Sequence, residues 1–99
     1  MIIYNITINI EDEIHEDWLN WMKSTHIPDV MACNLFESYK ICKIIAEDEG
    51  HTYSIQYTCK TMRKYTDYQT KYAAKLQKEH SDRYNNKFVA FRTLLEEIT

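Results

Sequence analysis

Glycine and proline are almost missing from this sequence, which has one residue of each among 99. Both are enriched in linkers, turns and disordered segments, so their scarcity argues against a flexible linker or a low-complexity stretch. Hydrophobic residues make up 44% of the chain and charged residues 27%, which is typical of a folded globular protein. Because a chain of this length forms one hydrophobic core, we expect a single domain over residues 1–99.

Long hydrophobic runs are missing as well, and none approaches the roughly 20 residues needed to cross a bilayer. The apolar segment 1–10 is interrupted by Asn5, Thr7 and Asn9. It has no basic start and is followed by acidic residues 11–13, so it is not typical of a signal peptide. We therefore expect a cytoplasmic protein without a membrane partner.

An excess of basic residues is also missing, since the net charge is -3. Because proteins that bind nucleic acid normally present a basic face to the phosphates, no nucleic-acid partner is expected. The cysteines Cys33, Cys42 and Cys59 form no CxxC pair and are expected to be free thiols in a reducing compartment. The sequence offers no set of four metal ligands at characteristic spacings, so neither a metal site nor a cofactor is predicted.

What the sequence does contain is the alternation typical of β-strands. In residues 2–10, every second position is isoleucine or tyrosine, and the positions between them are mostly polar. Residues 51–59 alternate in the same way, and residues 35–46 and 87–98 are the other two predicted strands. Gly50 falls in the turn before the third strand, where a hairpin needs a positive φ angle.

Two helices are predicted between these strands. Acidic residues 11–13 begin the first helix, since negative charge is favourable at its amino-terminal end. Pro28 disfavours helical geometry at Ile27, so this helix is predicted to break near His26, and a short helical turn over residues 28–32 follows.

Thr61 is the predicted cap of a second helix over roughly residues 62–80. The resulting order, βαββαβ, is that of the ferredoxin-like α+β fold. It predicts a four-stranded antiparallel sheet with two helices on one face.

The other face of this sheet has no helices, and the alternation assigns it a mixed surface. From the first and third strands it should carry Asn5, Thr7, Asn9, Ser54, Gln56 and Thr58. Arg92 joins them if Phe91 is buried under the helices. Three residues of the second strand also join them if the hairpin pairs residue 46 with residue 51: Tyr39, Ile41 and Lys43.

Apolar members of this open face are groups that should not face water together, namely Ile3, Ile41, Ile45 and Tyr39. We therefore expect two copies to pack their open faces together as a homodimer, around a partly polar cavity. Polar groups inside it would pair with one another, with water or with a ligand. The alternative is a solvated sheet face, which needs only polar residues.

His26 is the candidate for acid–base chemistry, because imidazole exchanges a proton near neutral pH and the end of a helix can reach a cavity. Asp29 is its candidate orienting partner, three residues on. The alternative is a histidine that stabilises the last carbonyls of the helix and needs no ligand.

Six residues are candidates for holding a ligand: Trp21, Asn5, Asn9, Gln56, Arg92 and Tyr39. Trp21 offers a flat ring, but its spacing also suits the core or a dimer contact. Arg92 on an enclosed face needs a carboxylate, from the partner chain or from an acidic ligand.

Residues 18–30 (WLNWMKSTHIPDV) resemble the first helix of the dimeric α/β-barrel superfamily, including its EthD-like and monooxygenase-like members. Nearly the whole chain resembles a family of short bacterial proteins of unknown function. The matching segments are MIIYN at 1–5, WM at 21–22 with HIPDV at 26–30, YSIQYTC at 53–59 and KFVAFRT at 87–93. The superfamily resemblance implies a homodimer whose open sheet faces close into a barrel.

We therefore expect a small homodimeric protein that binds a small organic molecule between its facing sheets, or that has a structural role. Because the superfamily includes cofactor-free monooxygenases, isomerases and cyclases, the alternative is a cofactor-free enzyme with His26 as general acid or base. The fold alone does not choose between these functions.

Overall fold

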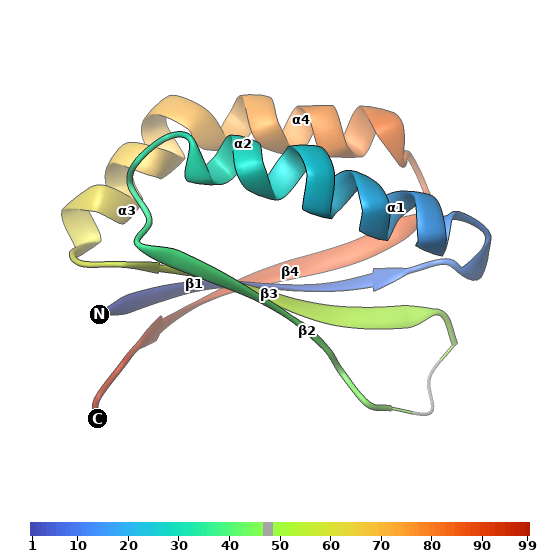
Figure 1. Ribbon diagram of the computed structural model, residues 1–99, viewed down its shortest axis with the longest axis horizontal. Coiled ribbons are helices and arrows are strands. Elements are labelled where there is room, and N and C mark those ends of the chain that lie inside the picture. Colours follow the sequence, from blue (N-terminus) through green and yellow to red (C-terminus); the bar gives the residue numbers. More distant parts are fainter. Residues whose placement is uncertain (47–48) are drawn as a thin grey trace.

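Within residues 1–46 and 49–99, which the computed structural model describes, strands and helices follow the predicted βαββαβ order (Figure 1). The elements are β1 (Ile2–Ile10), a 3-10 turn (Asp12–Ile14), α1 (His15–Trp21), a π-helical turn (Met22–His26), α2 (Ile27–Met31), β2 (Ser38–Lys43), β3 (His51–Cys59), α3 (Met62–Tyr68), a second π-helical turn (Gln69–Ala73), α4 (Ala74–Arg83) and β4 (Phe88–Glu96). Residues 47 and 48, in the predicted turn before the third strand, lie outside the described residues.

The strands form one antiparallel sheet in the order β2-β3-β1-β4. Figure 1 shows both helices on the same side of this sheet, and the part of the chain that the structure describes places no helix on the other side. The ferredoxin-like prediction is therefore confirmed. In the part of the chain that the structure describes, no helix has both the length and the apolar character needed to cross a membrane.

The first helix runs from α1 through the π-helical turn into α2 without a break, so the predicted break near His26 is wrong. In the π-helical turn, the backbone N–H of Ile27 donates to the carbonyl of Met22, five residues earlier. Pro28 then lies in the first turn of α2, where a missing N–H is tolerated. The wider turn thus accommodates a proline that would otherwise end the helix.

The second helix is continuous from α3 to α4 and ends at Arg83, a little beyond the predicted residue 80. Its predicted cap is confirmed, because the Thr61 hydroxyl accepts a hydrogen bond from the Lys64 backbone N–H at 3.2 Å. Gly50 has the predicted positive φ, 77°. A side chain there would also lie 2.6 Å from the carbonyl oxygen of Ile10, so glycine is required for space as well.

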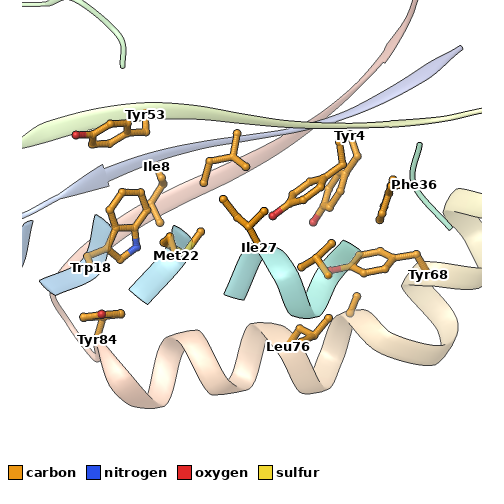
Figure 2. Close-up of a cluster of buried hydrophobic side chains, with 14 of the residues drawn as sticks. Tyr4, Ile8, Trp18, Met22, Ile27, Phe36, Tyr53, Tyr68, Leu76 and Tyr84 are labelled. Atoms are coloured by element: carbon orange, nitrogen blue, oxygen red, sulfur yellow. The ribbon is translucent and has the colours of Figure 1, made fainter. Parts of the chain in front are cut away.

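The core lies between the helices and the sheet (Figure 2). The strand register places Tyr4 opposite Tyr57 and Ile8 opposite Tyr53 on the helix-covered face. Fully buried side chains from the helices meet this face, led by Trp18 and Ile27. Burial of such apolar and aromatic surface is the main term that stabilises a domain of this size.

The register of β2 corrects one expectation about the open face. Tyr39 pairs with Tyr57 and Lys43 with Tyr53, one residue out of step with the assumed pairing of residues 46 and 51. A shift of one residue moves every side chain of a strand to the other face. Tyr39, Ile41 and Lys43 therefore lie on the helix side of the sheet.

The register of β4 corrects a second expectation. Arg92 lies opposite Ile6 on the helix side, and Phe91 lies opposite Thr7 on the open side. At the start of the strand, the Phe88 ring packs edge-on against His80 with the ring centroids 4.5 Å apart. The two-residue period of a strand then places Ala90 and Arg92 on the same side as Phe88.

The open face does carry Asn5, Asn9 and Gln56, as predicted. Their amides are used within the face, where the Ser54 hydroxyl donates to Asn5 Oδ1 at 2.6 Å and Asn9 Nδ2 donates to Thr52 Oγ1 at 2.9 Å. Beside this polar centre, β4 exposes a row of apolar side chains that includes Val89 (74% exposed), Phe91 (61%) and Leu95 (41%). The open face is thus half polar network and half apolar strip.

Candidate functional site

A cavity of about 50 Å³ lies between the helices and the sheet, on the side opposite the open face. One part of its wall is apolar and comes from the sheet and both helices, including Ile6, Ile8, Met22 and Phe88. The other part is polar: Tyr4, His26, Gln77, His80, Ser81 and Arg92. Ser81 on α4 and Arg92 on β4 are exposed, which places the mouth of the cavity between these two elements.

His26 is the last residue of the first π-helical turn, and its ring packs against Trp21 and His80 with centroid distances of 5.1 and 5.8 Å. Its Nδ1 atom is buried and has no hydrogen-bond partner among the described residues. An unpaired buried polar atom costs about 1–3 kcal/mol, and such atoms usually meet water or a ligand. Burial lowers the pKa of His26 to about 4, with Asp29 opposing and Arg92 adding to the effect.

His80 is buried on α4, and its Nε2 accepts a hydrogen bond of 2.9 Å from the Trp18 indole N–H. Because an indole nitrogen only donates, this His80 nitrogen is unprotonated and the neutral ring carries its proton on Nδ1. Burial, with smaller contributions from His26 and Arg92, lowers the pKa of His80 to about 4. Both histidines are therefore neutral at pH 7.

Arg92 is the cation of the cavity. Its Nε donates to the Tyr4 hydroxyl at 3.0 Å, which uses one of the five N–H donors of the guanidinium group. Burial raises the pKa of Tyr4, and Arg92 opposes that shift. Within residues 1–46 and 49–99, no carboxylate lies within ion-pair distance of Arg92.

The structure brings two of the predicted site residues, His26 and Arg92, to the same cavity. Asp29 is exposed on α2 and, among the described residues, makes no hydrogen bond to the buried Nδ1 of His26, so the expected orienting contact is not formed. Trp21 lies behind His26 and does not line the cavity, and Tyr39 is half-exposed on β2.

Sequence reasoning missed His80, Tyr4 and Gln77 as site residues. His80 follows Leu76 by four residues and so extends the apolar stripe of the second helix by one more turn. That spacing was available as a signal. The hydrogen bond from Trp18 could not be predicted from the sequence, because it joins residues 62 positions apart.

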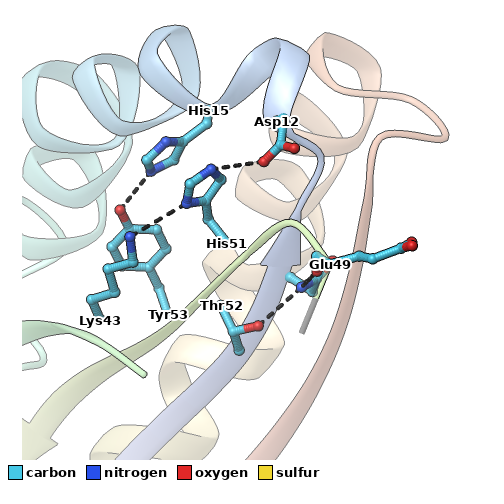
Figure 3. A network of polar contacts seen from close by, with 8 residues as sticks. Asp12, His15, Lys43, Glu49, His51, Thr52 and Tyr53 are labelled. Atoms are coloured by element: carbon cyan, nitrogen blue, oxygen red, sulfur yellow. Dashed lines mark hydrogen bonds and ion pairs between the residues drawn. The ribbon is translucent and has the colours of Figure 1, made fainter. Parts of the chain in front are cut away.

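A second polar cluster joins the β2–β3 end of the sheet to the start of the first helix (Figure 3). The rings of His15 and His51 stack with centroids 3.7 Å apart, the Tyr53 hydroxyl lies 2.6 Å from His15 Nε2, and Asp12 Oδ1 lies 2.8 Å from His51 Nε2. Burial, His51 and Lys43 lower the pKa of His15. Because the contacts are made within the cluster, we assign it a structural role.

Within the described ranges 1–46 and 49–99, no three histidine, cysteine, aspartate or glutamate side chains are grouped to hold a metal ion. The three cysteines are free. The chemistry of the cavity therefore rests on its neutral histidines, its phenols and its guanidinium group.

We expect the free energy of unfolding to fall as the pH is lowered from 6.5 to 4. In this range the unfolded chain protonates His26 and His80, whose ordinary pKa is 6.5, while the folded chain keeps them neutral until about pH 4. One pKa unit corresponds to about 1.4 kcal/mol, so the pair should account for a loss on the order of a few kcal/mol. Urea unfolding at several pH values measures this slope.

The variant His80→Gln isolates the contribution of one histidine, because its amide oxygen can still accept from Trp18 but does not titrate. It should show a shallower loss of stability than the wild type over the same range. Equal slopes for the two proteins would contradict the assignment of His80 as a buried neutral group.

Comparison with solved structures shows the same fold over the whole chain. An EthD family protein from Bacillus halodurans is similar with a TM-score of 0.69 and 14% identity, covering 99% of this chain and 100% of that chain. A dimeric ferredoxin-like protein from an uncultured marine organism has a TM-score of 0.70 at 11% identity, with coverage of 100% and 96%. A hydroxynitrile lyase from Passiflora edulis has a TM-score of 0.65 at 12% identity, with coverage of 99% and 96%. At these identities the likeness concerns the fold alone.

No curated protein matches the chain. A family model described as a domain of unknown function, DUF4286, matches residues 1–98. The match includes all the strands and helices described above, and the protein therefore belongs to the DUF4286 family.

Proposed function

We propose that this protein binds a small molecule in the cavity between its helices and its sheet, and that it acts as a cytoplasmic homodimer. The observation that carries the proposal is the buried, unpartnered Nδ1 of His26 in a residue that lines a cavity with His80 and Arg92. A few polar groups converging on an otherwise apolar pocket are what small-molecule sites have in common.

The size of the cavity limits the ligand. A volume of about 50 Å³ exceeds the need of one water molecule but is far below the roughly 300–1,000 Å³ of pockets for drug-sized ligands. It suits a ligand with a handful of non-hydrogen atoms, or the end of a longer molecule that passes the mouth at Ser81 and Arg92.

The ligand would then lie under the helices, and not in the space between two facing sheets that was expected from the sequence. The polar residues expected to hold it there, Asn5, Asn9 and Gln56, lie among hydrogen bonds within the open face, whereas His26 has an unused buried nitrogen. The open face is better suited to subunit contact, because its strip of β4 residues exposes apolar surface. Two similar solved structures are described as dimeric ferredoxin-like proteins, which supports a homodimer.

A cofactor-free enzyme remains the second candidate function. It is favoured by the two neutral histidines at the cavity, since a neutral imidazole can accept a proton from a bound substrate. A pKa of about 4 makes each ring a weak base at pH 7, so catalysis by His26 would need a substrate that raises its pKa.

Mapping the binding of small solutes by amide NMR tests the cavity. Acetone, propionamide and propionate, each added separately at millimolar concentration, should shift signals of residues such as Met22, Gln77 and Ala90 with at least one of the three. The variant Ala90→Met should remove these shifts by filling the cavity. Val89→Met, on the other face of the same strand, should leave them unchanged.

The proposal fails if none of the three solutes shifts the cavity signals, or if Ala90→Met leaves the shifts as they were. Shifts confined to residues of the open face would instead return the binding site to the space between the sheets.

The variant Phe91→Glu tests the dimer. The wild type should sediment with twice the chain mass of 12.0 kDa, and the variant should raise the dimer dissociation constant on the order of 100-fold, because each substitution counts twice across a symmetric interface. Leu94→Glu, on the same strand but on the helix side, is the matched control. A monomeric wild type, or equal effects of the two variants, would contradict an interface through the open face.

A further inference from the structure

We propose that the ligand of this cavity is a small carboxylate, held at the mouth by the Arg92 guanidinium group. This inference rests on the proposed function, since it names the chemical class of ligand for the same site.

Arg92 brings a positive charge to the helix side of the sheet, where the neighbouring positions of β4 are apolar. Ala90 lies on one side of it along the strand and Leu94 on the other, and Ile6 lies opposite on β1. The charged group of Arg92 donates a hydrogen bond to the neutral hydroxyl of Tyr4. Because Arg92 is exposed at the cavity mouth, water solvates the free guanidinium group, and an anion at the mouth can replace this water through charge-assisted hydrogen bonds. No carboxylate of the described ranges 1–46 and 49–99 lies within ion-pair distance of Arg92.

Among residues 1–46 and 49–99, Arg92 makes its hydrogen bond through Nε alone, so its two terminal nitrogens have no protein partner in these ranges. A hydrogen bond from Nε fixes the direction of the planar fork, and a fork held in this way is suited to paired hydrogen bonds with the two oxygens of a carboxylate. Tyr4 itself is buried in the core of β1, so it holds Arg92 from a rigid position. We therefore treat Tyr4 as a positioning residue.

The surroundings favour a carboxylate over a phosphate. His26 and His80 are neutral at pH 7, which leaves Arg92 as the cation among the residues that line the cavity. One fixed positive charge balances a monoanion, whereas a phosphate dianion usually meets several cations or a helix amino terminus. The apolar wall, with Ile6, Ile8 and Met22, can receive a short aliphatic chain behind the carboxylate.

The positive charge acts on the interior of the cavity, because Arg92 lowers the pKa of both histidines. A carboxylate paired with Arg92 would remove this influence and add its own negative charge, so the pKa of His26 and His80 should rise when it binds. The charged and titratable groups that act on the His26 ring are Asp29 from α2 and Arg92 from β4, and those that act on the His80 ring are His26 and Arg92.

Titration with sodium propionate and with propionamide separates charge from shape, since the two solutes have nearly the same size. At pH 7 and constant ionic strength, amide NMR should show propionate binding at least about tenfold more tightly than propionamide, as expected for hydrogen bonds to a charged group. Arg92→Gln should weaken propionate binding by a similar factor and leave propionamide unchanged. Arg92→Lys, which keeps the charge but loses the fork, should fall between the wild type and Arg92→Gln.

Arg83→Gln is the matched control, because it removes an arginine of α4 that pairs with Asp17 at 3.4 Å and does not line the cavity. It should leave both affinities unchanged. Equal binding of propionate and propionamide, or an unchanged propionate affinity in Arg92→Gln, would overturn the carboxylate assignment while the cavity itself still binds ligand. Absence of binding by acetone, propionamide and propionate alike would overturn the binding function and this inference together.

Discussion

The indole N–H of Trp18 donates to His80 Nε2 inside the core, and this hydrogen bond joins the first helix to the second above the sheet. Trp18 is fully buried and His80 nearly so, which makes an unpaired group on either side costly. The bond also fixes the protonation of His80, since an imidazolium ring has no nitrogen left to accept from the indole. A purely structural contact thus determines which groups the cavity can offer to a ligand: a neutral His80 with its proton on Nδ1, beside a neutral His26.

The register of the edge strand β4 determines which residues lie on each face of the sheet. Phe88 packs against His80, and the alternation that follows places Arg92 at the cavity and Phe91 on the open side. With β4 shifted by one residue, the cation would lie on the open face and the phenylalanine at the cavity mouth. The same strand therefore supplies the charge for the proposed ligand site and the apolar strip for the proposed dimer contact. With this arrangement, a chain of 99 residues would bind the proposed ligand on one side of the sheet and form the proposed dimer contact on the other.

The architecture was predictable from the sequence because alternation and capping are local properties. Residues 51–59 form β3 with the predicted bounds, Thr61 caps the second helix, and Gly50 has a positive φ. The site was less predictable because it depends on register and on contacts between distant residues. A shift of one residue in the register of β2 reversed the face expected for Tyr39, and the position of Phe91 on the open face, where it is exposed, reversed the face expected for Arg92. Pro28 did not end its helix, because a π-helical turn accommodates it, and His26 is the last residue of that turn.

The protonation of His80 and His26 is the most direct test of this account, and nitrogen-detected NMR of the two imidazole rings between pH 4 and 8 measures it. The account predicts that His80 is neutral down to about pH 4, with Nδ1 protonated and Nε2 showing the shift of a hydrogen-bond acceptor, and that His26 also stays neutral over most of the range. A His80 ring that carries its proton on Nε2, or that titrates near the ordinary value of about 6.5, would show that Trp18 does not donate to it, and the description of the cavity would then be wrong.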